Sequence, residues 1–153
     1  MTVTLDFQVD ESVLSDDRRH NPAGADPAVI ETTYFMMPGR FSVGDTEILQ
    51  TPSGPWLPQP VLGFATHLEQ SLDALRSSGF VSCSVAGAGT LTFRRRGEQV
   101  QLTCSFNRIE TEVSIDDLAG AFKDFRERVG AVLQTRVPEI TRHPSWSRWF
   151  PAS

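Results

Sequence analysis

Hydrophobic and polar residues alternate at the start of the chain. In TVTLDFQV, residues 2–9, every second residue from Val3 onward is apolar. This period of two predicts a half-buried strand. Residues 10–27, DESVLSDDRRHNPAGADP, have no sustained period and are dense in Asp, Pro and Gly, so they predict a long acidic loop that is either functional or mobile.

The next segment predicts short strands and a linker. A β-rich run from residue 28 reaches Met37, a turn follows at Pro38-Gly39, and a short strand then leads to a second turn at Gly44-Asp45. Residues 50–60, QTPSGPWLPQP, contain four prolines and one glycine, which predicts a Pro/Gly-rich linker.

Two later segments have the period of a helix. Apolar residues recur three and four positions apart over residues 60–78, and Gly79 supplies a C-terminal stop. A second apolar stripe runs over residues 115–133, where Ser114 is placed to cap the helix and Asp117 to complete a capping box.

Between these helices, residues 80–115 alternate as three linked hairpins. A turn at residues 87–89 sets Cys83 beside Phe93, and a turn at Arg96-Gly97 pairs Phe93 with Val100. A turn at Asn107-Arg108 pairs Leu102 with Val113 in the same way. Apolar residues then face apolar residues throughout, which predicts a four-stranded meander with one apolar face.

The other face of this meander is polar, and its last strand adds carboxylates. In the predicted register Glu110 and Glu112 lie opposite Ser105 and Thr103. The whole face carries Thr92, Arg94, Gln99, Gln101, Thr103, Ser105, Glu110 and Glu112.

Together these elements predict an α+β fold. We expect an antiparallel sheet that includes the four-stranded meander of the C-terminal half, with two main helices packed on one face. A chain of 153 residues with 39% hydrophobic composition suits a single domain over residues 1–153.

The predicted register separates the two cysteines, Cys83 and Cys104. They lie two strands apart and four residues along, which places their Cα atoms roughly 17 Å apart at ~4.8 Å per strand and ~3.4 Å per residue. A disulfide needs less than about 7 Å. We expect two reduced, buried thiols that act as small hydrophobic side chains.

No catalytic or cofactor motif is found in the sequence. None of the three histidines, His20, His67 and His143, has a zinc-binding spacing. GAGT at residues 87–90 leads into a strand and lacks the third glycine of a dinucleotide fingerprint. Asp116-Asp117 is explained by the positive end of the helix that it begins. We expect no cofactor, no metal site and no enzymatic activity.

Net charge narrows the choice of partner. The chain carries a net charge of −5, with one short basic cluster, RRR, at residues 94–96. An acidic background of this kind disfavours nucleic acid and suits a basic protein. No apolar run reaches the roughly eighteen residues that span a bilayer, and the N-terminus lacks a secretory pattern, so we expect a cytoplasmic protein without a membrane partner.

Tryptophans occur at two places where apolar residues are uncommon. Trp56, in the linker, is either packed over the sheet or an exposed anchor for a partner. The aromatic tail, residues 140–153, contains Trp146, Trp149 and Phe150. We expect the two tail tryptophans to close the core, because two exposed tryptophans would form a large apolar patch.

Four stretches carry a family resemblance: ETTYFMMPGRFSVGDTEIL, VLGFATHLEQSLDAL, TLTFRRRGEQVQLTCSF, and VSIDDLAGAFKDFRERVGAVLQTRVPEI followed by HPSWSRWF. In their layout they resemble a family of small uncharacterised bacterial domains that are associated with immunity against polymorphic toxins. The resemblance covers roughly residues 28–151 and implies no set of functional residues.

Two hypotheses follow. The first is a non-enzymatic immunity protein or adaptor that blocks one protein partner, such as a basic toxin domain, and uses Glu110, Glu112, Arg94, Gln101, Thr103 and Trp56. The alternative is a small-molecule-binding or enzymatic domain with a pocket between sheet and helices and with His67 or Cys104 at its wall. A large apolar pocket around a polar group with a strongly shifted pKa would favour the alternative.

Overall fold

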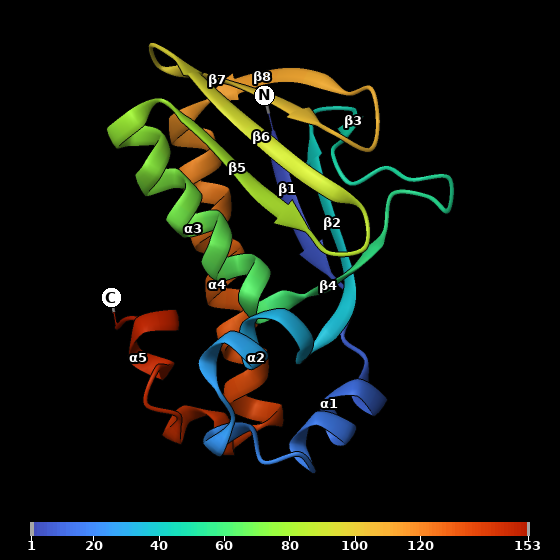
Figure 1. The fold of residues 1–153 in the computed structure, drawn as a ribbon, viewed down its shortest axis with the longest axis vertical. Helices are drawn as coiled ribbons and strands as arrows, with labels where there is room; N and C mark the ends of the chain where they lie inside the picture. The colour runs from blue at the N-terminus through green and yellow to red at the C-terminus, as the bar shows by residue number, and fades with distance from the viewer. Residues whose placement is uncertain (1, 153) are drawn as a thin grey trace.

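The computed structural model describes residues 2–152 and has an α+β fold (Figure 1), as predicted. In chain order the elements are β1 (Val3–Phe7), α1 (Glu11–Arg18), the 3₁₀ helix η1 (Pro22–Gly24), α2 (Pro27–Thr33), β2 (Met36–Val43), β3 (Thr46–Glu47), β4 (Leu57–Pro60), α3 (Val61–Ser78), β5 (Phe80–Val85), β6 (Gly89–Arg96), β7 (Gln99–Cys104), β8 (Glu110–Ser114), α4 (Ile115–Arg136), the 3₁₀ helix η2 (Pro138–Arg142) and α5 (Trp146–Trp149). Within these residues the strands form two antiparallel sheets of four.

The first sheet forms around β2, which pairs with β1, β3 and β4. The turn predicted at Pro38-Gly39 is wrong, because both residues lie inside β2, where they pair with Pro58 and Leu57 of β4. A Pro-Gly pair favours a turn locally, but pairing with neighbouring strands holds it extended here. The turn predicted at Gly44-Asp45 is confirmed and joins β2 to β3.

The long loop predicted over residues 10–27 is wrong, because two helices begin there. The Asp10 carboxylate caps α1 by accepting the N–H groups of Ser12 (3.0 Å) and Val13 (3.4 Å). Asp26 caps α2, and Pro27 fills its first position, where a missing N–H costs nothing. The β-rich run predicted from residue 28 is therefore helical as far as Thr33.

The segment 50–60 is a linker only in its first part, because its end forms β4. Gln59 of this strand is buried. Its side-chain amide donates to the carbonyl of Ala86 (3.0 Å) and accepts the N–H of Ala86 (3.2 Å). Gln59 thus joins the first sheet to the β5–β6 turn.

The two predicted main helices are confirmed as α3 and α4. α3 ends at Gly79, whose φ of +78° is a left-handed conformation that glycine adopts without strain. α4 begins after Ser114, whose hydroxyl accepts the N–H of Asp117 (3.1 Å). Figure 1 shows the two helices side by side under the meander, with α1, α2 and α5 gathered around the C-terminal half of α4.

The meander β5-β6-β7-β8 is confirmed, but each hairpin is displaced by two residues from its predicted register. Phe93, for example, pairs with Leu102 and not with Val100. The turn is centred on Gly97-Glu98, and Gly97 has φ +65°, in the first central position that favours glycine in a type II′ turn. A displacement of two keeps every side chain on its predicted face.

Aromatic rings from α4 hold the two sheets and the helices together. Phe122 and Phe125 make edge-to-face contacts with ring centroids 5.8–6.1 Å apart, and their partners are Phe7, Phe41, Phe64 and Phe93. Phe122 contacts a ring of the first sheet and a ring of the meander, so it joins the two. This core covers the inner face of the meander and leaves the outer face to solvent.

Candidate functional site

Five predicted site residues of β6, β7 and β8 form the outer face of the meander: Arg94, Gln101, Thr103, Glu110 and Glu112. In the ladder Arg94 pairs with Gln101, Gln101 with Glu112, and Thr103 with Glu110. Arg94 and both glutamates are exposed, and the other two are half-buried. The structure therefore brings these five residues together as cross-strand neighbours.

The predicted neighbours of the two glutamates are wrong. Glu110 lies opposite Thr103 and not Ser105, and Glu112 lies opposite Gln101 and not Thr103. The β7–β8 connection is a loop over residues 105–109 in place of the predicted two-residue turn.

Side-chain bonding at the β8 edge gives the outer face its shape. The Gln101 side-chain amide donates to the Glu110 carboxylate at 2.5 Å. Gln101, Glu110, Thr111 and Glu112 line a shallow hollow of about 320 Å³. The two carboxylates stand on an edge strand, because β8 ends the sheet order. This corner presents negative charge and hydrogen-bond acceptors to solvent.

Trp56 lies with the first sheet, apart from the five residues of the outer face. Its ring is half-buried, and the Arg40 guanidinium of β2 lies 5.7 Å from the ring centroid. Arg40 also forms an ion pair with Glu47, whose hydrogen bond and charge raise the pKa of the guanidinium. Packing over the first sheet, the first of the two predicted roles of Trp56, fits this contact.

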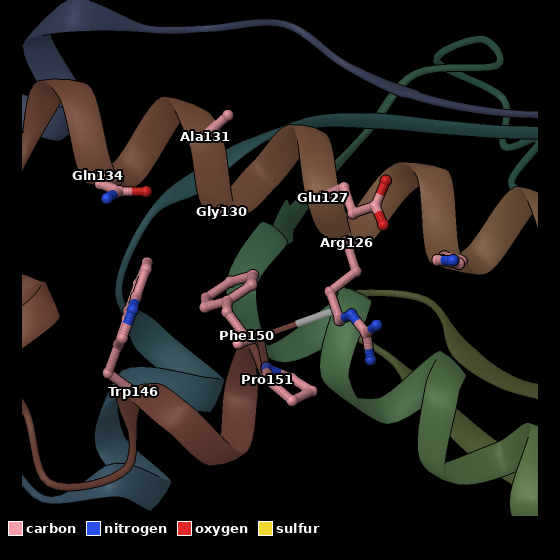
Figure 2. Close-up of a pocket in the computed structure, with 10 residues that line it drawn as sticks. Arg126, Glu127, Gly130, Ala131, Gln134, Trp146, Phe150 and Pro151 are labelled. Atoms are coloured by element: carbon pink, nitrogen blue, oxygen red, sulfur yellow. The ribbon is translucent and has the colours of Figure 1, made fainter.

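The aromatic tail closes the core through one tryptophan and lines a hollow with the other. Trp149 is 1% exposed and confirms the prediction, whereas Trp146 is half-buried. Figure 2 shows Trp146 and Phe150 projecting from the tail toward α4. Their ring centroids lie 4.5 Å apart. A Cβ on Gly130 of α4 would lie 2.8 Å from the Phe150 ring, so this glycine lets the tail dock.

This tail hollow, of about 360 Å³, was not predicted from the sequence. Its polar lining comes from α4 and includes Lys123, Arg126 and Gln134. Arg126 is directed to α3, where its guanidinium lies 3.8 Å from the Glu69 carboxylate, and burial raises the pKa of Glu69. The one available signal was Gly130, a glycine in a helix interior, which often marks close packing.

His143 has a structural role, and His67 lines surface hollows. His143 is buried: its Nδ1 accepts the N–H of Ser145 (3.0 Å), so its Nε2 carries the proton donated to the carbonyl of Ala25 (2.7 Å). His67 of α3 lines a small hollow of about 110 Å³ and lies 4.0 Å from the Glu31 carboxylate. This hollow is smaller than the roughly 300 Å³ of ordinary ligand pockets. His67 also lines an open hollow of about 360 Å³ between α3 and β5.

Both cysteines are free, as predicted, although they are closer than predicted. Cys83 and Cys104 pair with opposite sides of Leu91, which separates their Cα atoms by about 10 Å and still forbids a disulfide. The thiols are half-buried, and burial raises the pKa of Cys83 to about 11 and that of Cys104 to about 12. Such thiols stay protonated at neutral pH and are poor nucleophiles.

Comparison of the chain with family models, curated proteins and solved structures finds no match. Among residues 2–152 no three His, Cys, Asp or Glu side chains are grouped so that they would hold a metal ion. Over the same residues, no helix combines the length and apolar content that crossing a membrane requires.

Proposed function

We propose that this chain is a non-enzymatic binding protein that blocks one protein partner, in the manner of a toxin-neutralising immunity protein. The observation that supports this proposal is the outer face of the meander. Its five polar side chains lie together on a rigid sheet, and none of them belongs to the hydrophobic core. The sheet fixes the backbone of these residues, so binding a partner requires no ordering of the backbone at this face.

The charge of this face favours a basic partner. Glu110 and Glu112 are exposed at the edge strand, and the whole chain carries a net charge of −5. Acidic surface groups accelerate encounter with a basic protein through long-range attraction, which salt screens. A cationic toxin domain is the kind of partner that such a face fits.

The geometry supports the alternative of a small-molecule or enzymatic site less well. His67 lines two hollows, one of about 110 Å³ and an open one of about 360 Å³ beside β5, and Cys104 lines neither of them. The raised pKa of Cys104 also works against a nucleophilic role at neutral pH.

A charge-reversal experiment tests the proposal. Affinity purification from the native host, followed by mass spectrometry, identifies the partner, which is then purified. Glu110→Lys combined with Glu112→Lys should reduce the association rate constant roughly tenfold at low salt and weaken its salt dependence. The fold should stay within about 1 kcal/mol of the wild type, because isolated surface charges contribute little to stability.

A matched control separates the outer face from net charge. Asp16→Lys with Glu127→Lys makes the same change in charge on α1 and α4, at exposed positions away from the meander. This control should retain most of the wild-type association rate. Equal slowing in both double variants would mean that net charge, and not this face, determines the association rate. Unchanged association together with new self-association of the β8 variant would mean that the two carboxylates protect the sheet edge.

A further inference from the structure

The opposite edge of the meander, β5, has an unusual sequence for an exposed strand. β5 reads FVSCSV and contains no charged residue and no proline, the two features that commonly protect edge strands. β5 is the first strand of the sheet order, and among residues 2–152 no strand pairs with its free edge. We propose that β5 pairs antiparallel with β5 of a second copy of this chain, so that two meanders form one continuous sheet.

Backbone groups of β5 are oriented for such pairing. The N–H of Arg95 donates to the carbonyl of Gly79 (2.8 Å), so Gly79 directs its backbone toward β6. Orientation alternates along a strand, and the groups of Phe80, Ser82 and Ser84 therefore point to the free edge. The Phe80 carbonyl agrees, because it accepts the hydroxyl of Ser78 (3.0 Å) on that side.

The order of side chains makes the edge complementary to itself. Residues 81–85, VSCSV, read the same in both directions around Cys83. In an antiparallel pair centred there, Val81 faces Val85 of the second copy, Ser82 faces Ser84, and Cys83 faces Cys83. Ser82 and Ser84 then exchange backbone hydrogen bonds, and apolar residues stay on the core side. A twofold axis requires this match of a surface with itself.

A groove beside the strand leaves room for the second copy. A hollow of about 360 Å³ lies between β5 and α3, lined by His67, Gln70, Ser71 and Ala74 of α3 and by residues 81–84. The side chains of Ser82 and Ser84 lie on the outer face of β5, and those of Val81 and Cys83 lie on its core face. A hollow that contacts side chains of both faces must lie at the edge of the strand.

The lining of this groove lets a second copy approach without repulsion between charged side chains. Two chains of net charge −5 repel one another where their acidic surfaces meet. No Asp, Glu, Lys or Arg lines the groove, and the charged residues Glu69, Asp73 and Arg76 of α3 are not part of its lining. Self-pairing at β5 therefore brings no like charges of the groove together.

Phe80 gives a further reason to expect burial at this edge. It is 48% exposed and is one of three large apolar side chains exposed among the described residues. The Arg94 guanidinium lies 5.1 Å from its ring centroid, and the proposed register sets Phe80 opposite Ala86 of the second copy. Each β5 is used once, so the assembly closes as a dimer.

Sedimentation equilibrium from micromolar to millimolar concentration tests the proposal. The wild type should shift from the 16.9 kDa monomer to twice that mass. Ser84→Lys places a charge at the paired edge and should abolish the dimer. Gln99→Lys adds the same charge to the outer face of β7, two strands away, and should leave the dimer intact. Circular dichroism checks that both variants fold.

Cross-linking tests the register independently of these variants. In a non-hydrogen-bonded antiparallel pair the Cα atoms lie about 4.5 Å apart, within disulfide range. In a Cys104→Ser background at about pH 10, where part of the Cys83 thiol is ionised, added diamide should take up the two thiol hydrogens as the Cys83–Cys83 bond forms. The product is a covalent dimer that reductant reverses.

Three results would overturn the proposal: a monomer at every concentration, a dimer that survives Ser84→Lys, or a dimer that diamide does not link through Cys83. A wild type that stays monomeric and pairs β5 with a strand of an unrelated protein would also overturn the proposal. The partner-binding proposal uses β6 to β8, so its failure would leave this test unaffected.

Discussion

Replacing Trp149 by alanine tests how far the aromatic tail supports the fold. The Trp149 side chain is 1% exposed, and its ring centroid lies 4.6 Å from that of His143. His143 in turn donates a hydrogen bond to the carbonyl of Ala25 beside η1. The indole therefore packs where the tail meets the N-terminal helices.

The burial of Trp149 determines how much stability its removal should cost. Removing a buried tryptophan side chain costs about 3–5 kcal/mol, through lost apolar burial and through the cavity that remains. The indole N–H of Trp149 has no hydrogen-bond acceptor among the described residues, so the cost is one of packing. In a chain of this length each kcal/mol lowers Tm by about 2–4 °C, so Tm should fall by roughly 10 °C.

Urea and thermal unfolding followed by circular dichroism measure this loss. Trp146→Ala is the matched control, because it removes the same side chain from the same short helix at a half-buried position. It should cost about half as much or less, in proportion to the apolar area removed from the core. Equal losses for both variants, or a loss below about 1 kcal/mol for Trp149→Ala, would refute the reasoning.

Three further substitutions test other contacts. Gly63→Ala should lower the free energy of unfolding by more than about 2 kcal/mol in a urea titration, because overpacking is costly and the new Cβ would lie 1.7 Å from the carbonyl oxygen of Glu31. Asp17→Ala should cost about 1–3 kcal/mol in the same assay, because the Asp17 carboxylate accepts the N–H of buried Phe35 (2.6 Å), which has φ +60°. Burial raises the pKa of Cys83 from 9.0 to about 11, so only the unfolded chain loses this proton between those values. The free energy of unfolding should therefore fall as pH rises from 9 to 11, and Cys83→Ala should reduce this slope.

Elements with a long, repeated signal were predictable from the sequence. α3 and α4 each combine several turns of apolar period with a recognisable end, Gly79 for α3 and Ser114 for α4. By contrast, α1 and α2 are short and polar, and their start signals are the caps Asp10 and Asp26. Acidic residues followed by proline and glycine are typical of loops as well as caps, so composition alone favoured the wrong interpretation of residues 10–27.

The face of each meander residue was predictable, but its neighbour was not. Alternation has a period of two, so a displacement of two residues leaves apolar residues opposite apolar ones. Turn chemistry decides between such registers, and here Gly97 takes the first central position, where the prediction had placed it second. The composition of the outer face was therefore right while the partners of Glu110 and Glu112 were wrong.

Sites made by contacts between distant segments left almost no trace in the sequence. The Trp56 contact depends on Arg40 of β2, whereas Trp56 itself precedes β4. The tail hollow depends on the fit of Phe150 against Gly130, twenty residues earlier in the chain. Neither contact follows from a local period, because each needs the packing of two elements whose relative position only the whole fold determines.

The two edge strands of the meander, β5 and β8, differ in charge, and this difference makes the two proposals compatible. β8 carries Glu110 and Glu112 on its outer side, and like charges oppose pairing with another β8. β5 has no such protection. Pairing between two copies is therefore expected at β5 and opposed at β8. A dimer formed in this way keeps both acidic corners exposed at its far ends. Each copy would then still present its outer face to a basic partner, and a complex of two copies with two partners is the expected stoichiometry.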